Sequence, residues 1–205
     1  MVDGRHIKIY VEGGSKGKLF RECKEGFGRF LERAGLIGKM PKIIPCGSRN
    51  DTYKDFCIAL KNSQPGDLPL LLVDSEGPIT VTSNWLHVLQ RQGDGWTKPV
   101  DANDDHLHFM TQVMESWFLA DRAVLSAYFS PGFKEGKLPK GNELEAIPKL
   151  QVLEGLKAAT KECGREKTYH KGRHSFEILG EISPQLVATA SMSAKRLIDQ
   201  IKTGQ

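Results

Sequence analysis

The sequence predicts an α/β fold, with a mostly parallel, Rossmann-like sheet flanked by helices and followed by a helical C-terminal elaboration. Residues 70–73 form a continuous apolar run bounded by turn-forming residues, which is typical of a strand buried on both faces. Residues 7–11 alternate between apolar and polar side chains, as a second strand would. Strands and helical patterns follow one another along the first half of the chain, and this order favours parallel strands joined through helices.

The first predicted helix follows strand 7–11. Its apolar residues recur at intervals of three and four over residues 19–34, and Gly35 is expected to end it. A short strand is predicted at 42–45, where Pro45 indicates either the end of the strand or a position at the edge of the sheet.

The second predicted helix begins at Asn50 or Asp51, because either side chain can cap a helix. A loop at 64–67 then leads to strand 70–73. The apolar face of this second helix carries Tyr53, Phe56, Cys57 and Leu60.

The next segment allows two interpretations. A short helix at 84–90 and a loop at 93–99 precede it. Apolar residues alternate over 107–114 as in a strand, but the same run could also be the start of one long helix. We favour a strand at 107–114 followed by a helix at 115–128, because a fourth strand completes the sheet. This choice would put Glu115 at a strand end.

Beyond residue 130 the pattern becomes helical and rich in loops. Residues 144–159 favour a helix, and Ser183 followed by Pro184 is a typical helix start for a final amphipathic helix that ends near Ile201. We therefore assign residues 1–130 to the core and residues 131–205 to a helical elaboration packed on the same domain.

Composition places the chain among ordinary soluble globular proteins. It has 205 residues, of which 39% are hydrophobic and 26% charged. No apolar run reaches the roughly 20 residues of a membrane span, and the first residues do not resemble a secretory signal. The four cysteines lack paired spacing, so we expect neither zinc nor disulfides and a cytoplasmic location. A net charge of +4 permits a polyanionic partner without requiring one.

Carboxylates follow two of the predicted strands directly. Glu12 ends the first strand, and Asp74 and Glu76 follow the apolar run at 70–73. In an open α/β sheet the carboxyl ends of the strands are where ligands bind. If the strands are neighbours, the three carboxylates lie close enough to share one ion, and Mg²⁺ (or Mn²⁺) would relieve their repulsion. The alternative is that these acids only form turns or cap helices.

Two familiar motifs do not fit. The stretch from Gly13 to Leu19 resembles a phosphate-binding loop, but Glu12 replaces the required glycine and Leu19 replaces the required Ser or Thr. A carboxylate pointing into a phosphate cradle would repel the ligand. No nucleophile elbow or flanked cysteine suggests a hydrolase of the Ser/His or Cys/His type.

The strand-Glu-Gly segment at Glu12, followed much later by a strand ending in Asp74-Ser75-Glu76, resembles the Toprim domain of topoisomerases, bacterial primases and overcoming-lysogenization-defect (OLD) class nucleases. Together with residues 114–121 and 169–174, these motifs resemble the bacterial family catalogued as domain of unknown function 4276 over nearly the whole chain. The resemblance implies a Toprim-like fold. Some members of the family act as nuclease effectors of anti-phage systems beside an ABC-type ATPase, so the resemblance also implies that activity and that partner.

The resemblance also implies roles for single residues. Glu12, Asp74 and Glu76 would be catalytic and would hold the metal, with Glu76 standing where many Toprim proteins have an aspartate. Glu115 would supply a further metal ligand, and Lys171 would stabilise charge in the transition state. A solvated basic loop remains the alternative for Lys171. The residues expected to contact nucleic acid are Lys16, Lys18, His170, Arg173 and His174, whereas His106 and His108 are expected to be structural and Trp117 and Phe118 to lie in the core.

These inferences predict a magnesium-dependent nuclease that cleaves DNA or tRNA, restrained or presented by an ABC-type ATPase partner, with a homodimer as a further option. The alternative is a non-catalytic, Toprim-like interaction module of an ATPase complex. A phosphotransferase or phosphatase is less favoured, because no strand is followed by an aspartyl-nucleophile motif.

Overall fold

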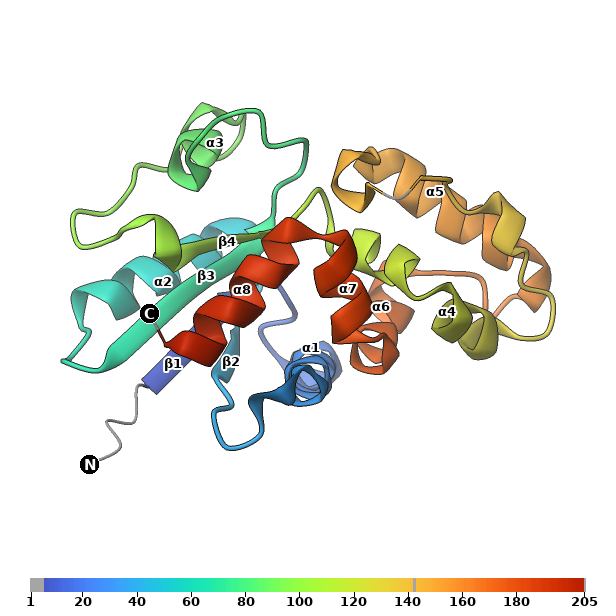
Figure 1. Cartoon of the computed structure of the whole chain (residues 1–205), viewed down its shortest axis with the longest axis horizontal. Helices are drawn as coiled ribbons and strands as arrows, with labels where there is room; N and C mark the ends of the chain where they lie inside the picture. The colour runs from blue at the N-terminus through green and yellow to red at the C-terminus, as the bar shows by residue number, and fades with distance from the viewer. Residues whose placement is uncertain (1–5, 142, 205) are drawn as a thin grey trace.

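The computed structural model describes residues 6–141 and 143–204, and it confirms the predicted α/β class. Four parallel strands form one sheet in the order β2-β1-β3-β4 (Figure 1). The strands are β1 (His6–Val11), β2 (Lys42–Pro45), β3 (Asp67–Asp74) and β4 (Leu107–Met110). Pro45 therefore lies on an edge strand, as its sequence suggested.

The register of the sheet decides which residues meet at its carboxyl edge. Val11 is level with Leu72 on β3, and Asp74 is level with Met110 on β4. Glu12 leaves β1 one residue after Val11, so it emerges beside the last residues of β3. Glu12 and Asp74 thus lie at the carboxyl ends of β1 and β3, on the same edge of the sheet.

Helices cover both faces of the sheet. One face packs against α1 (Gly17–Leu31) and α8 (Met192–Thr203), and α6 (Lys171–Glu181) packs on α1. The opposite face packs against α2 (Arg49–Lys61) and α3 (Asn84–Gln90). Each face has its own apolar cluster, because successive strand residues point to opposite sides.

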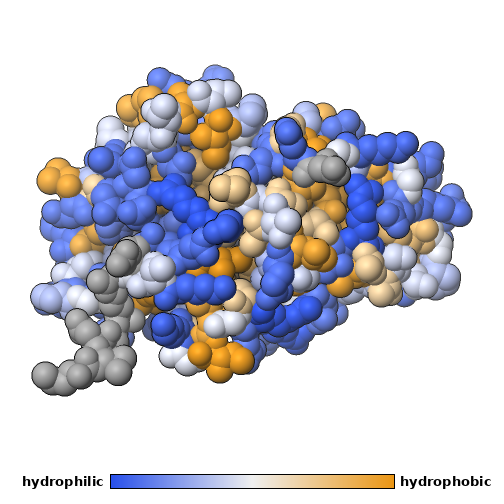
Figure 2. All heavy atoms as spheres, viewed as in Figure 1, coloured by the Kyte–Doolittle hydropathy of each residue, from blue (hydrophilic) through white to orange (hydrophobic). Residues whose placement is uncertain are grey.

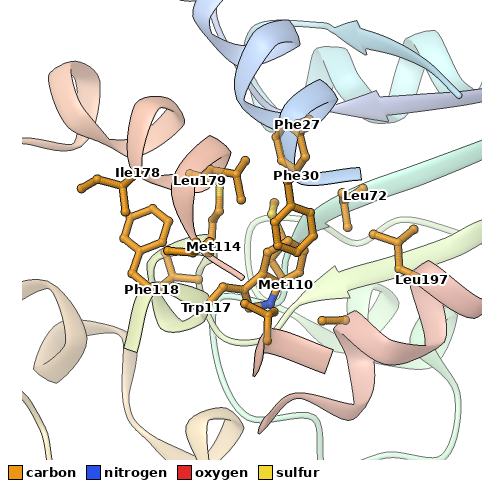
Figure 3. Packing of buried hydrophobic residues seen from close by; sticks show 14 of the residues in the cluster. Phe27, Phe30, Leu72, Met110, Met114, Trp117, Phe118, Ile178, Leu179 and Leu197 are labelled. Carbon is orange, nitrogen blue, oxygen red and sulfur yellow. The ribbon is translucent and has the colours of Figure 1, made fainter. Parts of the chain in front are cut away.

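The larger of the two clusters joins segments that are far apart in the sequence. Figure 3 shows side chains of α1, α6, α8 and the strands packed around Met114, Trp117 and Phe118. Phe30 stacks on Trp117 with ring centroids 5.3 Å apart. Trp117 and Phe118 are buried, as expected of core residues.

The remaining elements are 3₁₀ or π-helical turns and further helices. They are the π-helical turn η1 (Glu32–Leu36), the 3₁₀ turns η2 (Asp104–His106), η3 (Met114–Ala120), η4 (Glu135–Lys137), η5 (Leu144–Ala146) and η6 (Lys161–Cys163), and the helices α4 (Arg122–Phe129), α5 (Lys149–Thr160) and α7 (Pro184–Ala190). In Figure 1, α4 and α5 lie at the end of the molecule away from the sheet.

The predicted strand at 107–114 was too long. β4 ends at Met110, and residues 114–120 form the 3₁₀ turn η3. Every residue from 107 to 119 is buried, and the alternation seen over 107–113 runs on past Met110, so the sequence pattern does not mark the strand end. Asp74 fixes the change of direction, because its Oδ1 accepts a hydrogen bond from the Met114 N–H at 2.9 Å. Glu115 therefore lies in a 3₁₀ turn and not at a strand end.

Three helix boundaries also differ from the prediction. Ser48, not Asn50 or Asp51, caps α2, and its Oγ accepts the Asp51 N–H at 3.2 Å. The final helix is broken into α7 and α8 at Ser191, whose Oγ caps α8 and also donates to Glu145 at 2.6 Å. The third difference is at 144–159, where a 3₁₀ turn precedes α5.

The surface is mainly hydrophilic in the view of Figure 2, with apolar residues scattered between polar ones. Within the part of the chain that the structure describes, no helix combines the length and the apolar character needed to cross a membrane. All four cysteines are free thiols.

Candidate active site

A cavity of about 280 Å³ lies at the carboxyl edge of β1 and β3. Its polar side chains are Glu12, Asp74, Lys171 and Ser175. Glycines and apolar side chains complete the wall, namely Gly13, Gly14, Leu19, Gly47, Met110, Met114, Gly172 and Phe176. The first loop, the end of β3, the segment after β4 and the start of α6 thus meet at one place.

Asp74 is the last residue of β3 and is buried. One carboxylate oxygen, Oδ1, accepts the Met114 N–H, and the other, Oδ2, faces the Lys171 ammonium at 3.4 Å. Burial raises the pKa of this carboxyl group to about 7; the Lys171 charge opposes the shift, and the carboxylates of Glu115 and Glu12 add to it.

Glu115 is fully buried in η3 and completes the acidic cluster. Its Oε1 accepts hydrogen bonds from the Tyr169 hydroxyl at 2.7 Å and from the Ser175 hydroxyl at 3.2 Å. Its Oε2 accepts no hydrogen bond and faces the Lys171 ammonium at 3.5 Å. Glu115 thus joins the cluster from a 3₁₀ turn and not from the predicted strand end, and its partners Tyr169 and Ser175 were not predicted.

Lys171 is the first residue of α6, and its ammonium lies between Asp74 and Glu115. Burial alone would lower the pKa of this amine, but the negative charges of Asp74 and Glu115 outweigh that effect and raise it. Lys171 is therefore a cation throughout the physiological pH range. Its side chain remains half exposed.

Arg49 is a residue of the site that the sequence analysis missed. Its Nη1 donates to the main-chain oxygen of Asp74 at 2.6 Å and lies 3.4 Å from Glu12 Oε2. Two further hydrogen bonds of 2.8 Å join its guanidinium to the two oxygens of Asp94, and it lies over the Trp96 ring. An arginine in the first turn of a helix carries no sequence signal that would distinguish it from a surface residue.

Glu76 does not line the cavity. It has a positive φ of 66°, which is uncommon for a residue with a side chain. Its carboxylate pairs with the Lys149 ammonium at 2.6 Å and with Arg91 at 3.9 Å. The structure therefore brings Glu12, Asp74 and Glu115 together and directs Glu76 to a neighbouring ion pair.

The residues expected to contact nucleic acid have different surroundings. Lys16 and Lys18 are exposed beside the first loop, and His170 is exposed just before α6. Arg173 is exposed and forms an ion pair with Glu166. His174 corrects the expectation, because it is buried and its Nδ1 accepts the His170 N–H at 3.0 Å.

A second cavity, of about 400 Å³, adjoins this basic segment. It is lined by Arg165, Thr168, Tyr169, His170, Gly172 and Arg173. We call this second cavity the basic pocket and the cavity at Asp74 the acidic cavity. Gly172 lines both, so they share a wall at the start of α6.

The donor chemistry of the acidic cavity suits a hard divalent cation. Glu115 Oε2 is a buried carboxylate oxygen that accepts no hydrogen bond, and Asp74 Oδ2 faces the same ammonium. Proteins commonly hold Mg²⁺ through only one or two carboxylates together with water and phosphate oxygens. In residues 6–141 and 143–204, no three His, Cys, Asp or Glu side chains are already arranged to hold a metal. A cation would thus be held by few protein ligands.

A comparison with protein families gives one match. The family model described as "Domain of unknown function (DUF4276)" matches residues 11–202. The comparisons with curated proteins and with solved structures gave no match. The matched region includes every residue of the acidic cavity.

Proposed function

The chain belongs to the family described as domain of unknown function DUF4276, and we propose that it is a magnesium-dependent, Toprim-type nuclease. One observation carries the proposal: Asp74 and Glu115 each present a carboxylate oxygen to the Lys171 ammonium, and Asp74, Lys171 and Glu12 line one cavity. Carboxylates gathered around one cationic position are what phosphodiester cleavage assisted by a metal requires.

In this proposal Asp74 and Glu115 would hold Mg²⁺ (or Mn²⁺), with Glu12 beside them. The bound ion would polarise a phosphoryl oxygen and lower the pKa of a water molecule. Glu12 lies on the cavity wall, where it would serve as the general acid or base. Lys171 supplies the positive charge that stabilises negative charge developing on the phosphate.

Basic side chains around the two cavities would hold the substrate. Lys16 and Lys18 lie beside the first loop, and Arg165, His170 and Arg173 line or border the second cavity. A polyanion approaching three carboxylates needs such cations, because its phosphates would otherwise be repelled. The substrate class that fits is nucleic acid, either DNA or tRNA.

We further propose that the nuclease is a cytoplasmic anti-phage effector controlled by an ABC-type ATPase, either as a monomer or as a homodimer. This part of the proposal rests on the resemblance to defence nucleases and not on the geometry of the site.

One observation favours a second candidate, a non-catalytic interaction module of an ATPase complex. The site acids already have partners within the protein: Glu12 pairs with Arg49, Glu76 with Lys149, and Asp74 and Glu115 with Lys171. A charge-balanced cluster of this kind is also compatible with a purely structural role.

A nuclease assay separates the two candidates. Purified protein is incubated with plasmid DNA, single-stranded DNA and tRNA, in Mg²⁺, Mn²⁺ or EDTA, with and without the product of the neighbouring gene. The nuclease proposal expects cleavage by the wild type that EDTA abolishes, and no cleavage by Asp74→Asn. The matched control is Asp199→Asn, because Asp199 forms an exposed pair with Lys195 on α8. Absence of cleavage under every condition would favour the module.

A further inference from the structure

Asp74 and Glu115, the two buried carboxylates that face Lys171, divide their oxygens in the same way. Asp74 uses Oδ1 to accept the Met114 N–H, and Glu115 uses Oε1 to accept two hydroxyl groups. The remaining oxygens, Asp74 Oδ2 and Glu115 Oε2, both face the ammonium of Lys171 at 3.4 and 3.5 Å. One cation therefore occupies the position between them.

The carboxylates are fixed, whereas the cation can move. The side chains of Asp74 and Glu115 are 7% and 0% exposed, and protein groups hold one oxygen of each. The Lys171 side chain is 51% exposed and begins at the first residue of α6. Its ammonium can leave by rotation of its own stem, without any change in the helix.

We propose that Lys171 is a built-in counter-ion which a divalent cation displaces from between Asp74 Oδ2 and Glu115 Oε2. The inference rests on the proposed metal site but not on the proposed nuclease reaction. After displacement the ammonium remains tethered at the mouth of the cavity, next to Gly172, which borders the basic pocket. Lys171 would then be free to bind a phosphate of the substrate.

Displacement by the metal and simple support of the site predict opposite effects of removing Lys171 on the metal affinity. If Lys171 competes with the metal, its removal leaves two buried carboxylates without a counter-ion, and a divalent cation should bind more tightly. We expect a gain of about tenfold, since the cation no longer has to break a partly buried ion pair. If Lys171 only supports the site, its removal should leave the metal affinity unchanged or weaken it.

The test measures Mn²⁺ binding by calorimetry, without nucleic acid, for the wild type and for Lys171→Met. Methionine keeps an unbranched apolar stem and removes the charge. Lys195→Met is the matched control, because Lys195 is 52% exposed and its partner, Asp199, lies on the same helix α8. We expect tighter binding only for Lys171→Met. Unchanged or weaker binding in folded Lys171→Met, or no binding in either protein, would overturn the inference.

A measurement on the wild type avoids any loss of folding in the variant. Acetylation of lysine amines by an anhydride is followed by peptide mass spectrometry, with and without Mn²⁺. Displacement of the ammonium predicts faster acetylation of Lys171 in Mn²⁺ and an unchanged rate at Lys195. An unchanged or slower rate at Lys171 would contradict the inference.

The two proposals can fail separately. Tighter Mn²⁺ binding by Lys171→Met together with no cleavage of any nucleic acid would retain the counter-ion role and reject the nuclease. Magnesium-dependent cleavage by the wild type without a gain in Mn²⁺ affinity would do the reverse.

Discussion

The Arg49 guanidinium donates a 2.6 Å hydrogen bond to the main-chain oxygen of Asp74, and so joins the first turn of α2 to the end of β3. The same side chain is fixed by two hydrogen bonds to Asp94, whose carboxylate is 1% exposed. Arg49 is therefore both a partner of a buried acid and a support for the residue at the centre of the cavity.

Arg49→Gln is expected to destabilise the protein by about 3 kcal/mol, because it leaves the buried Asp94 with one partner fewer. Urea unfolding followed by circular dichroism measures the loss. Arg29→Gln is the matched control, since Arg29 and Glu181 form a pair in which both side chains are about half exposed. That control should lose no more than about 1 kcal/mol. Equal losses in both variants would show that the Arg49 contacts contribute no more than a surface pair.

Glu115→Gln should weaken metal affinity while keeping the fold. The amide oxygen can still accept hydrogen bonds from Tyr169 and Ser175, but the charge facing the cation is lost. We expect the Mg²⁺ concentration for half-maximal cleavage to rise about tenfold or more, as is typical when a group that tunes a metal site is removed. Glu177→Gln, on the exposed side of α6, is the control. An unchanged magnesium dependence would assign Glu115 a structural role.

The raised pKa of Asp74 predicts that metal binding weakens in mild acid. This pKa lies at about 7 in the metal-free protein, chiefly because the carboxyl group is buried. Below that pH the group holds a proton that a cation must displace, so affinity should fall as the pH decreases from about 8 to 6. Calorimetric titration with Mn²⁺ across this range measures the effect. A constant affinity would mean that Asp74 does not bind the cation.

Lys171→Ala should lower turnover more than it lowers substrate binding. A preorganised cation that stabilises charge developing in the transition state typically accounts for about a hundredfold to a thousandfold in rate. Cleavage at saturating substrate and several salt concentrations measures both effects. A lysine that only binds the nucleic-acid backbone would instead weaken binding and reduce the salt dependence. Full turnover by the folded variant would remove Lys171 from the catalytic residues.

The strand ends could be predicted from the sequence because the strands carry their own signal. Glu12 directly follows an alternating strand pattern and Asp74 a continuous apolar run, and the parallel order places both at one edge of the sheet. The order of helices and strands over the first half of the chain was predictable for the same reason. The end of β4 was not, because the alternation of residues 107–113 continues past Met110, where the strand ends.

The remaining site residues depend on tertiary contacts that no local pattern encodes. Arg49 comes from the start of α2, and Tyr169 and Ser175 reach Glu115 from more than fifty positions away in the sequence. The direction of Glu76 is set by a turn with positive φ and by Lys149, which belongs to a distant helix. Sequence spacing therefore identified the acids, whereas their partners required the structure.

His108 makes stability depend on pH independently of the site. Its imidazole is 1% exposed, and Nε2 donates to the Asp105 main-chain oxygen at 3.0 Å, so the neutral ring fits the core. Burial, with a smaller contribution from Arg196, lowers the pKa of His108 from 6.5 to about 4.

Because the folded pKa is the lower one, the stabilisation from His108 is complete above pH 6.5 and is lost as the pH falls towards about 4. The difference between these two pKa values corresponds to roughly 3 kcal/mol of stabilisation. His108→Gln retains a donor for the Asp105 oxygen but cannot take up a proton in this range. Its unfolding free energy should therefore fall less steeply than that of the wild type between pH 6.5 and 4, which urea unfolding at several pH values measures. Parallel curves for the two proteins would show that protonation of His108 does not contribute to acid unfolding.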